Sequence, residues 1–149
     1  IQLATFLKSK PNLNENDIND SVKYIKLAAE KGNLFATCEY ACILLKGLNG
    51  EKKPEEAAKY FKIAADKGSP CAMYKLGNML SEGYGVNVDK NEAINYYQKA
   101  IDSKYYRACL KIAQIYFNGE GIDVNKEKAL DYLRMAYENG IISEIPNTI

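Results

Sequence analysis

The sequence predicts an all-α fold, a right-handed superhelix (solenoid) of antiparallel helix pairs that repeats every 36 residues. Three observations support this prediction. Apolar side chains follow a helical spacing within each segment, glycines close the segments, and small and aromatic residues recur at the same phase of the repeat. The clearest recurrences are Tyr24, Tyr60, Tyr96 and Tyr132, then Ala28, Ala64, Ala100 and Ala136, then Gly32, Gly68 and Gly140.

Residues 1–32 are predicted to form a truncated first unit. Residues 1–10 look like the end of a helix, which Pro11 must stop. The stretch 11–20 is rich in Asn and Asp, so we expect a loop whose last residues cap a second helix over 21–31.

Three full units are predicted at 33–68, 69–104 and 105–140. Each has a first and a second helix, expected over 34–46 and 55–67, 70–82 and 91–103, and 105–118 and 126–139. Pro54 sits in a first helical turn, where its missing N–H costs nothing. The tail 141–149 is expected to fray or to cap the last helix, so that 1–149 is a single repeat domain.

Small residues also recur on the faces that paired helices would present to each other. They are Ala57, Ala93 and Ala129, then Ala36, Ala72 and Ala108, then Ala41, Gly77 and Ala113. Ala or Gly at facing positions lets two helix backbones approach more closely than the usual distance of about 8–10 Å. One pair cannot bury both of its faces, so we expect the pairs to stack on a continuous core.

The composition excludes several classes of function. The net charge is +1, with 20 basic and 19 acidic residues dispersed along the chain, so we expect no nucleic-acid partner. The longest apolar runs are too short to span a bilayer, so no direct membrane insertion is expected. The chain has no histidine, which removes histidine-dependent catalysis, histidine-ligated metals and histidine pH switching.

The four cysteines have no fixed repeat phase. Cys38 and Cys42 are four residues apart and share one helix face, while Cys71 and Cys109 stand alone. We interpret all four as reduced, buried or half-buried small apolar residues, as in a cytoplasmic protein. A four-thiolate zinc site is the alternative, but the usual paired spacing is missing.

Catalytic signals are weak as well. No carboxylate pair is set apart by its phase or by apolar surroundings that would separate the two pKa values. The turn Gly83–Gly85 lies between predicted helices, whereas a phosphate-binding loop follows a strand. We therefore predict that the chain is not an enzyme and has no cofactor.

One stretch of the chain resembles a known repeat. Residues 72–85 read AMYKLGNMLSEGYG, and the next matching positions are Val86, Asp89, Ala93, Tyr96, Tyr97 and Ala100. This pattern resembles the Sel-one-like repeat (SLR) family, the α/α relative of the tetratricopeptide repeat, whose own period is 34. From 108 to 140 the match persists, with Ile122 in place of Val and Asn125 in place of Asp, and it is weaker from 36 to 68.

The resemblance implies a protein–protein interaction scaffold or adaptor that binds a partner protein or peptide. It also implies that the first helix of each unit lines a concave groove. The positions of these helices that lie off the core stripe are then groove candidates: Cys38, Cys42, Leu45, Tyr74, Asn78, Ser81, Arg107, Leu110, Gln114 and Phe117. Of the other aromatic residues, Tyr84 is expected to be partly exposed and Tyr96 to be buried.

Other interpretations stay open. The groove candidates differ between units, and they could equally be ordinary variable surface. The chain begins with Ile1 rather than Met, so we expect a piece of a longer protein, in which it would be a regulatory or assembly module, for example beside a kinase domain. An enzyme related to cysteine-rich SLR proteins is a further alternative, although the irregular cysteines depart from their pattern.

Overall fold

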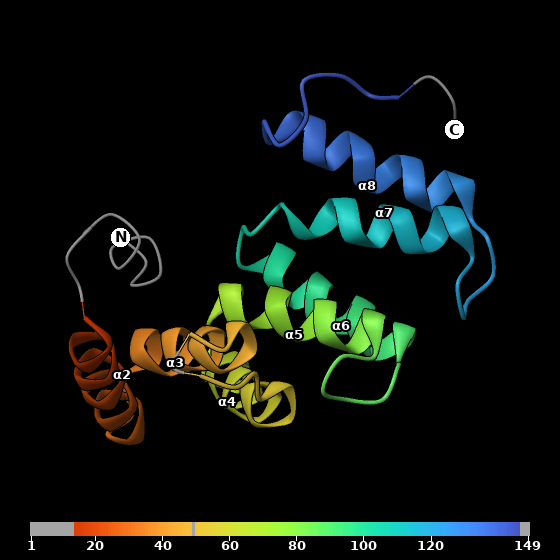
Figure 1. The fold of residues 1–149 in the computed structure, drawn as a ribbon. Coiled ribbons are helices and arrows are strands. Elements are labelled where there is room, and N and C mark those ends of the chain that lie inside the picture. The colour runs from red at the N-terminus through yellow and green to blue at the C-terminus, as the bar shows by residue number, and fades with distance from the viewer. Residues whose placement is uncertain (1–13, 49, 147–149) are drawn as a thin grey trace.

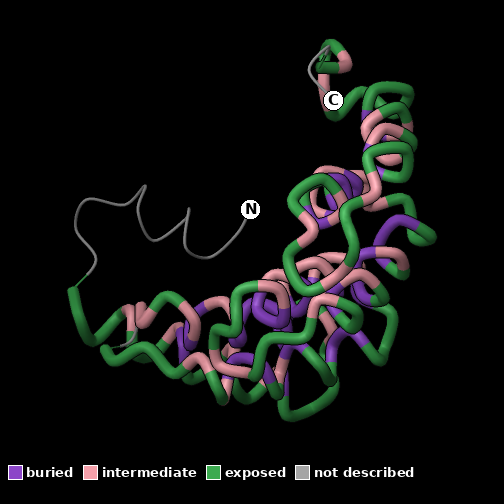
Figure 2. Tube along the Cα trace, turned by 90° about the vertical axis from the view of Figure 1, so that its right-hand side faces the viewer, coloured by how far each residue is buried: buried purple, intermediate pink, exposed green. Residues whose placement is uncertain are grey.

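The computed structural model describes residues 14–48 and 50–146, and these residues contain seven α-helices and no strand. The helices are α2 (Glu15–Glu30), α3 (Leu34–Lys46), α4 (Pro54–Asp66), α5 (Pro70–Glu82), α6 (Lys90–Asp102), α7 (Ala108–Asn118) and α8 (Lys126–Glu138). Each helix packs mainly against the helices before and after it in the chain. Figure 1 shows the pairs stacked one after another, and Figure 2 shows the stack bending into an arc. The predicted all-α superhelical array is confirmed.

The connection inside each full unit is held by one recurring backbone contact. Gly47, Gly83 and Gly119 end α3, α5 and α7 in the left-handed conformation, with φ of 67°, 69° and 67°. The residue that precedes the next helix then donates its N–H back to the last turn of the first helix. These bonds are Lys53 to Leu44 (2.8 Å), Asp89 to Leu80 (2.9 Å) and Asn125 to Tyr116 (2.9 Å).

The prediction for the first unit was wrong in its boundary. Residues 15–20 are helical rather than a loop, because α2 begins at Glu15. Asn14 and Asp17 form a capping box: the Asp17 N–H donates to Asn14 Oδ1 at 2.8 Å, and the Asn14 N–H donates to Asp17 Oδ2 at 3.3 Å. Asn and Asp side chains that suggested a loop therefore stabilise the first turn of α2. The helix predicted for 1–10 lies outside the described residues.

Later boundaries agree closely with the prediction. The expected ranges 34–46 and 70–82 are those observed, and α4, α6 and α8 each end one residue earlier than expected. The helix expected from Tyr105 begins only at Ala108, since 105–107 form a turn. Residues 141–146 are not helical, and Ile142 packs against the core.

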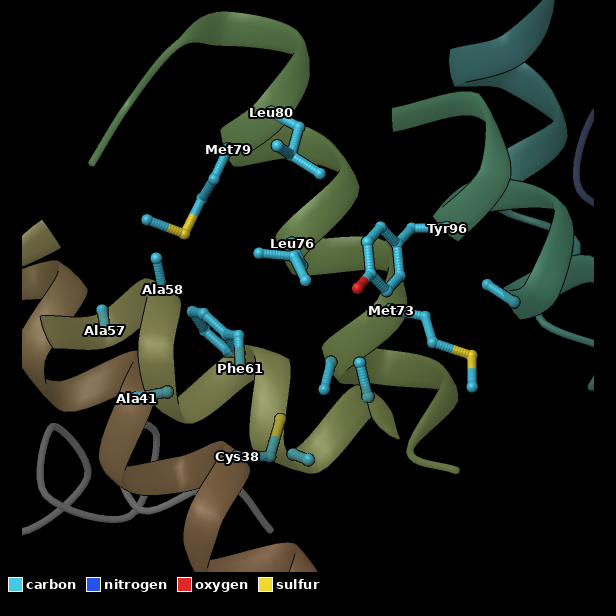
Figure 3. Close-up of a cluster of buried hydrophobic side chains, with 14 of the residues drawn as sticks. Cys38, Ala41, Ala57, Ala58, Phe61, Met73, Leu76, Met79, Leu80 and Tyr96 are labelled. Atoms are coloured by element: carbon cyan, nitrogen blue, oxygen red, sulfur yellow. The ribbon is translucent and has the colours of Figure 1, made fainter. Parts of the chain in front are cut away.

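The predicted small residues lie in the core. Ala57, Ala72, Ala93, Ala108 and Ala129 are fully buried. Figure 3 shows the core between α3, α4 and α5, where Phe61, Leu76 and Leu80 fill the space beside the alanines. The larger side chains therefore fill the gaps that the close backbone approach leaves.

Tyr24 is an exception to the repeat. It is 71% exposed, although its equivalent Tyr96 is buried. Tyr60, another equivalent, packs edge-on against Tyr40 with ring centroids 4.9 Å apart. The residue that would stand to Tyr24 as Tyr40 stands to Tyr60 is residue 4, which lies outside the described residues.

Gly77 is a point of tight packing between α5 and α6. A Cβ placed there would lie 2.7 Å from Cε1 of Tyr97. The Tyr97 ring is buried, and its hydroxyl donates a 2.6 Å hydrogen bond to Oδ1 of Asn78. The ring therefore cannot move aside cheaply.

We predict that Gly77→Ala destabilises the protein by about 1 kcal/mol, because the clash outweighs the gain in helix propensity. Chemical unfolding monitored by circular dichroism measures this change. The final unit carries Ala113 and Leu133 at the equivalent positions. Gly77→Ala should therefore cost less in a Tyr97→Leu background, and an equal cost in both backgrounds would contradict the proposed clash.

Lys104 occupies a position where the other units carry glycine. Its φ is 66°, and the equivalent glycines Gly32, Gly68 and Gly140 have φ of 87°, 95° and 74°. The left-handed conformation costs a non-glycine residue about 1–2 kcal/mol. Glycine at this position would avoid the steric cost, but part of the gain would be lost because glycine loses more backbone entropy on folding.

We predict that Lys104→Gly raises the free energy of unfolding by about 0.5–1 kcal/mol. The matched control is Lys62→Gly, at an exposed position inside α4, which should lower it by about 1 kcal/mol. Both are measured by urea unfolding. A loss of stability in Lys104→Gly would show that the left-handed turn is not strained.

Candidate partner-binding face

The groove candidates all come from α3, α5 and α7 or from the residue before α7, and we call their surface the first-helix face. The structure leaves them exposed to different degrees. Arg107, Gln114 and Phe117 are exposed, while the half-buried members are Cys42, Leu45, Tyr74, Asn78, Ser81 and Leu110. Cys38 is only 7% exposed, so it lies beneath this face rather than on it.

Tyr74 of the first-helix face packs against two other tyrosine rings, the buried Tyr97 of α6 and the half-buried Tyr105 before α7. The Tyr74 ring centroid lies 5.9 Å from that of Tyr97 and 5.2 Å from that of Tyr105. Burial raises the pKa values of Tyr97 and Tyr105, so both phenols stay neutral at physiological pH. This part of the face therefore offers aromatic surface and hydroxyl groups rather than charge.

Ser81 is occupied by a contact between units. Lys90 donates from Nζ to the Ser81 hydroxyl at 3.0 Å and forms an ion pair with Glu120 at 3.1 Å. The Lys90 side chain is largely buried, whereas Glu120 is exposed. These three residues come from α5, from the start of α6 and from the loop after α7, so they connect two neighbouring units.

Three of the cysteines belong to two neighbouring units. Cys38 and Cys42 lie on α3, and Cys71 lies in the first turn of α5. Interaction with the sulfurs of Cys42 and Cys71, together with burial, raises the pKa of Cys38. No disulfide joins the four cysteines in the structure; Cys38 and Cys109 are buried, and Cys42 and Cys71 are half-buried.

The same interactions have the opposite effect on the other two sulfurs. Interaction with Cys38, with a smaller contribution from the Lys75 ammonium, lowers the pKa of Cys71 to about 6, although burial and Glu39 oppose the change. The pKa of Cys42 is lowered for the same reasons. Burial instead raises the pKa of Cys109 to about 11. Among residues 14–48 and 50–146, no His, Cys, Asp or Glu group has an arrangement that could hold a metal ion.

Sequence reasoning missed a hollow of about 450 Å³ on another surface. It lies between α4, α5, α6 and the connection after α5, with Leu76, Leu80 and Tyr96 among its apolar lining and Lys59 and Glu92 among its charged lining. The signal for it was in the repeat. Val88 and Val124 are exposed apolar residues at the same phase of two polar connections, and Val88 lines the hollow. Elsewhere, Tyr84 is exposed and Tyr96 buried, as predicted.

Comparison with protein families gives one match. The family model described as "Sel1 repeat" matches residues 14–33, 34–69, 72–105 and 107–141. Among curated proteins, none matches this chain. In the described part of the chain, no helix combines the length and apolar character needed to cross a membrane.

Several solved structures are similar, and three of them illustrate the match. A protective antigen of uropathogenic Escherichia coli with an SLR fold has a TM-score of 0.76 and 26% identity, over 80% of this chain and 26% of the antigen. A Sel1 repeat protein from Oxalobacter formigenes has a TM-score of 0.77 and 26% identity, over 93% of this chain and 64% of its own. Cysteine-rich protein B of Helicobacter pylori shares the fold, with a TM-score of 0.62 and 21% identity over 88% of this chain and 94% of its own. The chain thus spans about a quarter of the first structure and just under two thirds of the second.

We predict that Cys71 is alkylated by iodoacetamide with a half-maximal rate near pH 6, because the thiolate forms as the pH rises through the lowered pKa. The rate at each cysteine is followed by mass spectrometry of peptides. Cys109, with a pKa of about 11, should stay unmodified at pH 8. Lys75→Met should move the Cys71 midpoint upward, whereas Lys62→Met should not. A Cys71 midpoint near 9, the ordinary value, would contradict the electrostatic account.

Proposed function

Because the chain belongs to the Sel1 repeat family, we propose that it is a non-catalytic scaffold that binds a partner protein or peptide along the first-helix face. Sel1 repeat proteins are generally protein-interaction scaffolds. The observation that carries the proposal is a difference between two sets of positions within the repeat. The recurring small residues are buried between helices, while the residues of the first-helix face change from unit to unit.

The chemistry of this face suits a polypeptide partner. Phe117 is 39% exposed, and Tyr74 and Leu110 are half-buried, so the face combines apolar surface with partial solvent access. Asn78 and Gln114 add amide groups that can pair with a peptide backbone. Aromatic residues and arginine are enriched where proteins bind one another. Arg107 and Phe117 are therefore the side chains on which we expect binding to depend most.

The proposal also covers cofactors, nucleic-acid partners and the cellular compartment. We propose no cofactor and no nucleic-acid partner, in line with the dispersed charge and the absence of histidine from the sequence. The four free thiols favour a reducing compartment, and we propose the cytoplasm.

We predict that the double variant Arg107→Glu/Phe117→Ala weakens partner binding about tenfold or more, since truncating an aromatic anchor and reversing an arginine each remove central contacts. The partner is captured on the immobilised wild-type protein, identified by mass spectrometry, and its affinity is then measured by titration. This double variant and the control variant described below are first checked for an unchanged melting curve.

The matched control is Arg134→Glu/Tyr137→Ala, which makes the same charge reversal and a similar aromatic truncation at exposed positions of α8. The control should bind as the wild type does. Equal binding by all three proteins would exclude the first-helix face. Loss in the control alone would place the partner on the second helices.

A further inference from the structure

The hollow beside Val88 shares no lining residue with the first-helix face. Leu76 and Leu80 of α5 are buried and form its floor, and the buried Tyr96 ring of α6 lies beside them (Figure 3). Val88 lies at the edge and is 60% exposed. The space of about 450 Å³ is within the range of about 300–1,000 Å³ that is usual for binding pockets, and its base is apolar.

The Val88 edge is held in place by the backbone around it. The Val88 side chain packs directly against Gly83, where the missing Cβ leaves room for it. Val124 packs against Gly119 in the same way one unit later, and it is 54% exposed. The connection therefore keeps an apolar group at the surface in both units, and a partner that covered Val88 would remove that group from water.

The next unit shows why this hollow is open. The equivalent hollow there has a volume of about 260 Å³. Its lining includes four residues that are equivalent to Lys62, Leu80, Glu92 and Tyr96, namely Gln98, Tyr116, Lys128 and Tyr132. The Tyr116 ring stacks on Tyr132 with the centroids 6.2 Å apart, and it occupies space that the smaller Leu80 leaves free. The hollow beside Val88 is therefore available to a group from outside the chain.

Carboxylates gather at one end of the hollow. A Cβ at Gly85, in the connection that leads into α6, would lie 2.5 Å from the carbonyl oxygen of Pro54, the first residue of α4. The two helices therefore begin at the same end. Glu55 in the first turn of α4 and Glu92 in the first turn of α6 are exposed and line the hollow there. Asp89 adds a third carboxylate, which also accepts the Glu92 N–H at 2.9 Å.

The other end of the hollow is positively charged. Lys59 and Lys62 are exposed residues of α4 that line it one and two turns after Glu55. A helix rises about 1.5 Å per residue, so Glu55 and Lys62 are about 10 Å apart along the axis. Neither lysine belongs to an ion pair among the residues that the structure describes. A ligand with charges of one sign would be repelled at one end, whereas a partner with both signs matches both ends.

We propose that this hollow binds an extended segment of a partner polypeptide in which one large apolar side chain lies between a basic and an acidic residue. The apolar side chain fills the space above Leu80 and beside Tyr96. The basic residue faces the carboxylates at the helix starts, and the acidic residue faces Lys59 and Lys62. In an extended segment alternate residues point to the same side, at about 3.3 Å per residue. The pattern basic–x–apolar–x–acidic therefore separates its charges by about 13 Å, which the long lysine side chains can match.

The test titrates the isotope-labelled full chain with a synthetic peptide and follows backbone amide shifts by NMR. The peptide contains Lys-Ser-Leu-Ser-Asp, flanked by glycines and blocked at both ends. We expect saturable shifts at Val86, Asn87 and Val88, which line the hollow. Three matched peptides replace Leu by Ala, Asp by Lys, or Lys by Asp. Each should bind about fivefold more weakly or worse, because it lacks the apolar group or one charge match.

Two variants of the protein test the assignment of the two ends and of the floor. Lys59→Glu/Lys62→Glu should bind the mixed-charge peptide about tenfold more weakly and should prefer the peptide with two lysines, an exchange that unfolding could not produce. Leu80→Tyr introduces the residue of the next unit, so it should fill the hollow and weaken binding about tenfold. Circular dichroism checks that both variants fold.

The matched control is Lys23→Glu/Lys26→Glu, which makes the same charge change at the same spacing on exposed positions of α2. It should bind all four peptides as the wild type does.

Several outcomes would overturn the proposal. They are no shift at the hollow with millimolar peptide, equal binding of the four peptides, or an unchanged preference in Lys59→Glu/Lys62→Glu. Binding of N-acetylleucine amide as tight as that of the peptide would make the hollow a site for small apolar molecules instead. Shifts confined to the first-helix face would reject this proposal and leave the proposed function standing.

Discussion

The need for small residues where the helices face one another is the constraint on which this architecture depends. At Gly77 even one methyl group would meet the Tyr97 ring at 2.7 Å, and the alanines on the facing helices are fully buried. Side chains this small leave little surface for the hydrophobic effect, so stability must come from the larger residues wedged beside them, such as Phe61 and Leu76. Because small residues recur at the same positions in each unit, the spacing between helices repeats along the chain and the stack extends regularly.

The glycine-containing connections carry this regularity from one unit to the next. A Cβ at Gly85 would lie 2.5 Å from the carbonyl oxygen of Pro54, at the start of the second helix of the preceding unit. Its equivalent Gly121 lies against Lys90 in the same way, with a Cβ position 3.2 Å from Lys90 Cγ. Both glycines have positive φ, at 74° and 76°. The connection therefore both reverses the chain and sets the contact between units, which explains why an extra glycine is retained there.

The sequence predicted the features that recur and missed those that arise once. Helix ranges 34–46 and 70–82 followed from the repeat, whereas the capping box at Asn14 was hidden inside a stretch whose composition suggests a loop. The hollow beside Val88 was missed because it is formed jointly by α4, α5, α6 and the connection after α5, while the first helices alone were considered as a binding surface.

The positions that the fold does not need are where this chain differs from a uniform repeat. Cys38, Tyr74 and Leu110 are equivalent, yet Cys38 is buried and the other two are half-buried, so the same phase has a different exposure in each unit. The packing alanines change little between units because any larger group would clash, whereas these positions accept a thiol, a phenol or an isobutyl group. A solenoid can therefore carry different chemical groups at these positions without a change in how its helices pack. In this chain that chemistry includes the group of tyrosine rings around Tyr74.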